Sequence, residues 1–154
     1  MRTITYYSTN NCDERVNFET ALLKGMASNY GLYMIARKDV PVLAPERISA
    51  MRPMPYAQVA FEVLYPFLGS EIPAEKLKGL LDDAYREDKI PTKVQRITGK
   101  TYIMWLTQGP TYSFKDYAAR FFGRALNYFL GERGLKRVVI VATSGDTGGA
   151  VADA

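Results

Sequence analysis

The pattern of apolar and polar positions predicts a mostly helical first region that ends at about Lys93. In two stretches the apolar residues recur at roughly every third or fourth position, which is typical of helices with one buried face. Shorter elements are indicated by their end residues, such as Asn17 as an N-cap and Gly25 after a last turn. In chain order we expect an edge strand over residues 3–7, a loop over 8–15, a helix over 18–24, a strand over 31–35, and helices over 45–51, 55–67 and 73–85.

From Val94 onward the pattern changes to an alternation of strands and helices. Thr98, Gly99 and Lys100 separate two short apolar stretches, which is the composition of a β-hairpin turn. Residues 138–142 form an uninterrupted, largely β-branched run, typical of a strand covered on both faces in a parallel sheet. This region therefore predicts strands over residues 94–97, 102–106 and 138–142, and helices over 114–130 and from Thr147 onward.

Together the two regions predict an α/β fold. Residues 1–93 are expected to form a small, mostly helical domain, and residues 94–154 the beginning of a parallel-sheet domain. The final helix has no C-cap, and a parallel strand buried on both faces needs neighbours that this chain barely supplies. We therefore expect the sequence to be an N-terminal piece of a longer protein, with the remainder of that polypeptide as its partner.

Composition limits the possible classes of function more than it suggests one. The net charge of +4 is spread along 154 residues without a run of Lys and Arg, so nucleic-acid binding is not indicated. Cys12 is the only cysteine, and no stretch resembles a secretory signal or a membrane span, which predicts a cytoplasmic protein without a membrane partner. Because the chain has no histidine, a Ser-His-Asp triad and a histidine-ligated zinc site are excluded.

The segment GPTYSFKDYAARF, residues 109–121, places Lys115 at the start of a predicted helix. Ser113 is a suitable N-cap with Asp116 as its acidic partner, and Asp116 can pair with Arg120 one turn later. A cation in the first turn opposes the helix dipole, so this position favours a neutral amine, the form that condenses with an aldehyde. The alternative is an ordinary surface lysine whose ammonium group points into water.

The segment VVIVATSGDTGG, residues 138–149, joins the predicted buried strand to a helix start through a glycine-rich turn. Such a turn exposes backbone N–H groups at the positive end of a helix dipole, which suits a carboxylate or a phosphate. The carboxylate of Asp146 disfavours a phosphate cradle and suits contact with a substrate or a ring hydroxyl. The alternative is a tight connection whose glycines serve backbone geometry and whose Ser, Asp or Thr side chains serve as caps.

Taken together, the two segments resemble the threonine synthase family. GPTYSFKDYAARF is similar to that family's H-G-P-T-x-x-F-K-D-[FY]-A-A-R-F, and VATSGDTGGAVADA to its A-T-S-G-D-T-G-x-A-V-A-x-A. Upstream, YYSTN resembles the family's Y-x-S-T-R, and the stretch through ALLKG and GLY resembles the region leading to its D-G-G-L-Y. The resemblance covers nearly the whole chain in the same order. Three positions depart from it: Gln108 replaces His, Asn10 replaces Arg, and Asn29-Tyr30-Gly31 replaces D-G-G.

The resemblance implies a fold-type II pyridoxal 5′-phosphate enzyme, a lyase of threonine biosynthesis that converts O-phosphohomoserine and water to threonine and phosphate. It implies that Lys115 carries the cofactor and acts in catalysis, and that Asp146 takes part in cofactor binding. It also implies that the loop for the cofactor phosphate lies beyond Ala154, so that this chain alone is inactive. The residues implied for substrate binding are Ser144, Gly145 and Thr147 in the glycine-rich turn and, with weaker support, Thr111 and Ser113.

Two other functions stay open at this point. A related pyridoxal-phosphate-dependent phospholyase would release a keto acid instead of threonine, and Gln108 in place of the family's His is the reason to consider it. Alternatively, the chain acts only as a folded structural or interaction module. The sequence is compatible with an oligomer but does not predict its size.

Overall fold

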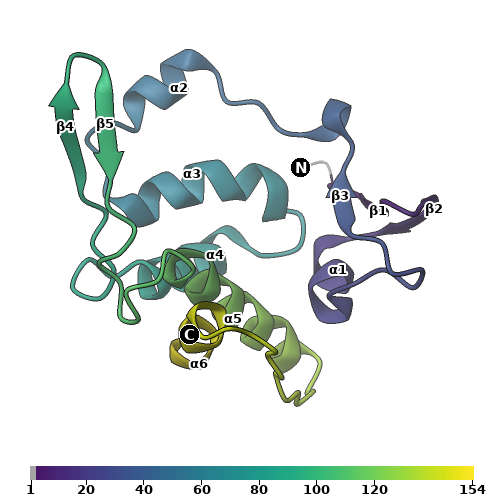
Figure 1. Ribbon diagram of the computed structural model, residues 1–154. Helices are drawn as coiled ribbons and strands as arrows, with labels where there is room; N and C mark the ends of the chain where they lie inside the picture. The colour runs from purple at the N-terminus through teal and green to yellow at the C-terminus, as the bar shows by residue number, and fades with distance from the viewer. Residues whose placement is uncertain (1–2) are drawn as a thin grey trace. The chain divides into compact units, whose positions relative to one another are not determined.

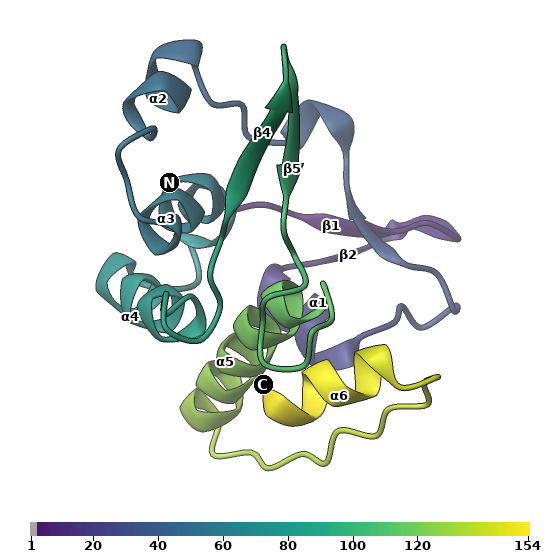
Figure 2. The ribbon, with the colours of Figure 1, turned by 60° about the vertical axis from the view of Figure 1, so that its left-hand side comes forward.

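The computed structural model of the protein describes residues 3–154, apart from the side chain of Cys12. The described chain forms two compact units, one up to Lys78 and one over Gly79–Ala154 (Figures 1 and 2). Helix α4 (Ala74–Ala84) crosses this division, which lies earlier in the chain than the domain boundary expected after Lys93. Each unit has its own antiparallel sheet, and no pair of parallel strands occurs among the described residues.

The first unit contains a three-stranded antiparallel sheet in the order β2-β1-β3. Its strands are β1 (Tyr6–Ser8), β2 (Asn11–Val16) and β3 (Tyr33–Ile35). Two expectations are wrong here, because β1 is central instead of an edge strand and the expected loop over residues 8–15 contains most of β2. The polar residues of β2 are tolerated because an edge strand pairs through its backbone, and the side chains of Asn11, Asp13 and Arg15 are exposed to solvent.

Helix α1 (Phe18–Lys24) begins and ends as the sequence predicts. The side chain of Asn17 accepts a hydrogen bond from a first-turn N–H group at 3.1 Å, and Gly25 follows the last turn with φ 73°. The Glu71 carboxylate accepts two further N–H groups of the first turn, each at 2.9 Å. The start of α1 is therefore stabilised by one local side chain and one that is distant in sequence.

The other helices of the first unit lie close to their predicted positions. They are α2 (Pro45–Ala50) and α3 (Tyr56–Leu68), with the short 3-10 helix η1 (Arg37–Asp39) before them. Pro45 occupies the first turn of α2, where its missing N–H group removes no hydrogen bond. In the helix predicted over residues 73–85, Leu77, Leu81 and Ala84 are fully buried, which confirms the predicted apolar face at these three positions.

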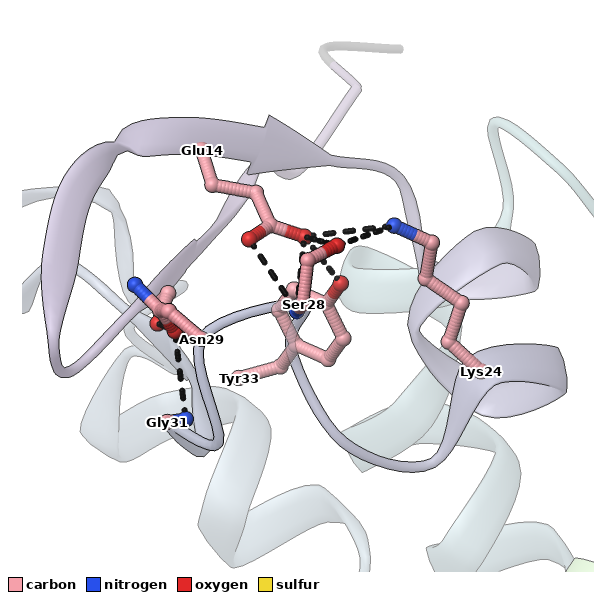
Figure 3. A network of polar contacts seen from close by, with 7 residues as sticks. Glu14, Lys24, Ser28, Asn29, Gly31 and Tyr33 are labelled. Carbon is pink, nitrogen blue, oxygen red and sulfur yellow. Dashed lines mark hydrogen bonds and ion pairs between the residues drawn. The ribbon is translucent and has the colours of Figure 1, made fainter.

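A network of polar side chains holds the loop between α1 and β3 (Figure 3). Its centre is the carboxylate of Glu14 on β2, which accepts hydrogen bonds from the Tyr33 hydroxyl at 2.6 Å, the Ser28 hydroxyl at 3.3 Å and the Lys24 ammonium at 3.2 Å. The hydrogen bond from Tyr33, more than the other donors, holds the pKa of the Glu14 carboxyl below its usual range. The same loop contains Tyr30 with φ 63°, a left-handed conformation that is uncommon for tyrosine.

Asparagines fix the other side of this loop. Asn29 Oδ1 accepts the Ser8 hydroxyl at 2.7 Å. It also accepts the Gly31 N–H group at 3.2 Å (Figure 3). Asn10 Nδ2 donates to the carbonyl oxygen of Asn29 at 3.0 Å, so two of the positions that depart from the family motifs contact each other. Gly31 is required here, because an added Cβ would collide with the Ser8 hydroxyl.

The second unit contains an exposed β-hairpin and two helices that lie side by side (Figures 1 and 2). Strands β4 (Val94–Thr98) and β5 (Thr101–Met104) join through a turn with Gly99 at φ 51°, which confirms the predicted hairpin. Helices α5 (Asp116–Glu132) and α6 (Asp146–Asp153) each begin within two residues of their expected starts. Their pairing brings together the two sequence segments that carry the family resemblance.

Residues 138–142 do not form the predicted buried strand. The segment is irregular, and Val138 and Ile140 are 86% and 90% exposed. A strand is stabilised by hydrogen bonds to its neighbours, and no strand among the described residues pairs with this segment. Its β-branched residues favour a strand conformation, but among the described residues the segment has no neighbouring strand to pair with.

Candidate active site at the starts of α5 and α6

Buried Arg120 fixes α6 against α5. Its Nε atom donates to the carbonyl oxygen of Ala84 at 2.8 Å, and its Nη1 atom lies 3.0 Å from the Asp153 carboxylate. The sequence suggested a pair between Arg120 and Asp116 instead, but Asp116 is bonded elsewhere. Arg120 is only 6% exposed, and its contact with Asp153 holds α6 against α5, while its contact with Ala84 holds α5 against the end of α4.

Lys115 and Asp146 lie next to each other at the two helix starts. Lys115 is the N-cap residue of α5 and not a first-turn residue as expected, and Asp146 is the first residue of α6. The Lys115 Nζ atom lies 3.8 Å from Asp146 Oδ2 and 4.3 Å from the centre of the Phe114 ring. Condensation with an aldehyde requires the neutral amine, so this ion pair has to open before Lys115 reacts.

A cavity of about 420 Å³ lies beside this pair. Lys115 and Thr147 supply its polar lining, and the other lining side chains are apolar. An apolar pocket with a few convergent polar groups is typical of a site for a small molecule. The apolar residues that line it are Phe114, Ala118, Ala119, Phe122 and Val151.

In the loop before Lys115, the hydroxyl groups of Thr111 and Ser113 form hydrogen bonds within the loop and the start of α5. Thr111 Oγ1 donates to the Asp116 carboxylate at 2.5 Å, and Thr111 N donates to the second carboxylate oxygen at 3.0 Å. Ser113 Oγ accepts the Lys115 N–H group at 3.3 Å, and Ser113 is 7% exposed. The expected capping pair of Ser113 with Asp116 is therefore wrong, because Asp116 reaches back to Thr111.

Thr143 organises the glycine-rich turn, although it was not among the site residues predicted from the sequence. Its Oγ1 atom accepts the N–H groups of Gly145 and Gly148 at 3.2 and 3.3 Å. Gly145 has φ 130°, a conformation that residues with a Cβ rarely adopt. The signal that points to Thr143 is its place just before the turn, because threonine is a preferred capping residue.

The start of α6 offers free hydrogen-bond donors. No acceptor among the described residues contacts the backbone N–H groups of Asp146 and Thr147. Ser144, two residues before Asp146, is exposed. Free N–H groups at the positive end of a helix dipole suit a carboxylate, so the predicted residues of this turn are available to a ligand.

Two features are absent from residues 3–154. In that part of the chain, no group of three or more His, Cys, Asp or Glu side chains could hold a metal ion. None of the helices described there is both long enough and apolar enough to cross a membrane. Among the residues that line the cavity, Lys115 carries the amine, a group that can form a covalent bond with an aldehyde.

Comparisons with known proteins agree on the family. The family described as "Threonine synthase N terminus" matches residues 5–85. The threonine synthases of Pseudomonas aeruginosa and Escherichia coli are 36% and 31% identical over 148 residues, covering 94% and 96% of this chain. This chain spans about a third of their length, 31% and 33% respectively.

Solved structures give the same result. The PLP-bound threonine synthase from Brucella melitensis matches 98% of this chain with a TM-score of 0.88 at 34% identity, and the chain covers 32% of that protein. The threonine synthase from Escherichia coli matches 97% with a TM-score of 0.84 at 32% identity, and 33% of it is covered. These matches confirm the mixed helix-and-strand fold expected from the sequence. On the match over residues 5–85, the chain belongs to the threonine synthase N-terminus family.

Proposed function

We propose that the protein carrying this chain is a pyridoxal 5′-phosphate-dependent threonine synthase and that Lys115 binds the cofactor. The reaction is the conversion of O-phosphohomoserine and water to threonine and phosphate. The observation that supports it is the Lys115 amine at an apolar cavity, 3.8 Å from Asp146 on a second helix start. The similar proteins are named threonine synthase, and one solved structure is described as PLP-bound.

The cavity fits the ring and the aldehyde of pyridoxal phosphate. Its volume of about 420 Å³ lies in the range of small-molecule sites, and its apolar lining suits a flat ring. Lys115 is the only amine in that lining, so an aldehyde there has a single partner. The Asp146 carboxylate beside the start of α6 works against binding the cofactor phosphate at the same place. The described residues therefore fit the reactive part of the cofactor and not its phosphate.

We assign proton transfer and binding of the substrate carboxylate to different residues of this chain. When bound, the cofactor supplies an electron sink for the charge left by removal of an α-proton. The Lys115 amine is placed to take up and return a proton, and the Asp146 carboxylate lies 3.8 Å from it. The free N–H groups at Asp146 and Thr147, with Ser144 and Gly145 before them, bind the substrate carboxylate.

Chemical labelling tests the cofactor assignment. Full-length protein loaded with pyridoxal phosphate is reduced with borohydride, digested and mapped. We expect the label on Lys115, because this lysine lines the cavity. A label on another lysine in its place would rule out the assignment. Analysis of the product, threonine or a keto acid, separates threonine synthase from the phospholyase that Gln108 suggests.

The proposal extends to the organisation of the whole protein. Residues 1–93 correspond to an N-terminal domain and residues 94–154 to the beginning of the catalytic domain, which the rest of the polypeptide completes. A single cysteine, Cys12, fits a reducing compartment, so we place the protein in the cytoplasm.

A further inference from the structure

The loop before Lys115 wraps around a buried carboxylate. Asp116 is 1% exposed, and its two carboxylate oxygens receive the N–H group and the hydroxyl of Thr111 at 3.0 and 2.5 Å. Gly109 packs against the same carboxylate so closely that an added Cβ would collide with it. Burial of a carboxylate costs free energy unless its oxygens are hydrogen-bonded, so the two bonds from Thr111 are needed.

These bonds hold the loop in one shape. The Tyr112 N–H group donates to the Gly109 carbonyl at 3.1 Å, and Tyr112 has φ 59°. A tyrosine keeps a positive φ only where its surroundings enforce it. The loop ends at Lys115, which makes no side-chain capping bond of its own. The backbone that carries the amine is therefore held by the pair of Thr111 and Asp116, together with the hydrogen bond from the Lys115 N–H group to Ser113 Oγ.

We infer that Thr111 and Asp116 are positioning residues that set where the Lys115 amine lies at the cavity. Neither side chain lines the cavity, and the Thr111 hydroxyl is already donated to Asp116. Thr111 thus acts through Asp116. We assign it this positioning role in place of the substrate-binding role that the sequence suggested for Thr111. The inference rests on the proposed function, because it concerns the same lysine.

A set of threonine variants in the full-length protein tests this role. Thr111→Val removes the hydroxyl but keeps the shape and the N–H group, and Thr111→Ser keeps the hydroxyl. Thr101→Val on the exposed strand β5 makes the same chemical change at a distant site. The measurements are the rate of pyridoxal phosphate uptake by absorbance, the borohydride-labelled peptide, kcat and KM.

We expect Thr111→Val to slow both cofactor uptake and kcat by roughly 10- to 100-fold with little change in KM, because a small displacement of a reacting group is costly. Thr111→Ser should restore most of the rate, and Thr101→Val should match the unaltered protein. A raised KM with unchanged uptake would mean that Thr111 contacts substrate, which overturns the inference. Equal behaviour of Thr111→Val and Thr101→Val would also overturn it. Failure to label Lys115 in the unaltered protein instead overturns the proposed function, and the inference with it.

Discussion

Each unit contains a loop organised by one carboxylate, and each loop holds a tyrosine at positive φ. In the first unit the carboxylate is Glu14 and the tyrosine is Tyr30, with φ 63°. In the second unit they are Asp116 and Tyr112, with φ 59°. The Glu14 side chain is 19% exposed, and its donors come from α1, β3 and the intervening loop. Asp116 is 1% exposed, and its carboxylate accepts two hydrogen bonds, both of them from Thr111.

The difference shows how two similar backbone shapes can depend on their carboxylates to different degrees. Around Glu14, the loss of one donor leaves others, and water can reach the vacated oxygen. Around Asp116, water has little access, so the loss of the carboxylate leaves buried donors without an acceptor. The redundant arrangement suits a loop with a structural role. The arrangement with a single partner suits a loop that has to place one amine, Lys115.

The largest expected effect is on turnover, and it distinguishes the two lysines that pair with carboxylates. Lys115 lies 3.8 Å from Asp146, and Lys24 lies 3.2 Å from Glu14. In the full-length protein, Lys115→Arg should lower turnover by orders of magnitude, because a guanidinium is not deprotonated and cannot serve as the amine nucleophile. Lys24→Arg, the matched control, should leave turnover near its original value. The measurement is phosphate release. Normal turnover by Lys115→Arg would contradict the claim that Lys115, unlike Lys24, takes part in the reaction.

An effect of intermediate size is expected on the free energy of unfolding when either carboxylate, Asp116 or Glu14, is removed. Asp116→Ala should lower the free energy of unfolding by about 1–3 kcal/mol, because it leaves the N–H group and the hydroxyl of Thr111 without their acceptor. Glu14→Ala should lower it less, because its exposed donors turn to water. Urea denaturation of the two variants measures both values. Equal losses of unfolding free energy in the two variants would show that the deeper burial of Asp116 does not make its hydrogen bonds more important for stability than those of Glu14.

The smallest effect is a pH dependence confined to the Glu14 loop. The hydrogen bond from Tyr33, followed by the contacts of Lys24, holds the pKa of Glu14 below its ordinary value of 4.5. A carboxyl with a lowered pKa stabilises the folded state above its ordinary pKa, and this contribution is lost as pH falls through the lower, folded value. Glu14→Gln should therefore be less stable than the unaltered chain at neutral pH, with a gap that shrinks below pH 4.5. Urea midpoints at several pH values test this, and a gap that is constant or widens in acid would contradict it.

Elements with local signals were predictable from the sequence. Asn17 and Gly25 mark the ends of α1 because a cap acts on backbone groups of the adjacent turn. Strand β2 was missed because its polar residues carry no apolar alternation, and its place is set by pairing with β1. Residues 138–142 were predicted as a strand for the opposite reason, since their composition is favourable but no described strand pairs with them.

The same limit applies to the candidate site. The sequence placed Lys115 and Asp146 at two helix starts, but their separation of 3.8 Å depends on how α6 packs against α5. The bond from Asp116 back to Thr111 follows no standard capping pattern, so the sequence favoured Ser113 as the cap instead. Thr143 lies within the turn that was singled out, yet its two bonds depend on the backbone shape of that turn.

The exposed segment over residues 138–141 has a consequence for the colloidal behaviour of this chain. Short β-branched segments without proline are the kind that stack between copies into cross-β assemblies. Lys136 and Arg137 stand directly before the segment, where charged residues oppose such stacking by repulsion between copies. Salt screens that repulsion. We therefore expect added salt to promote association of this chain in concentrated solution.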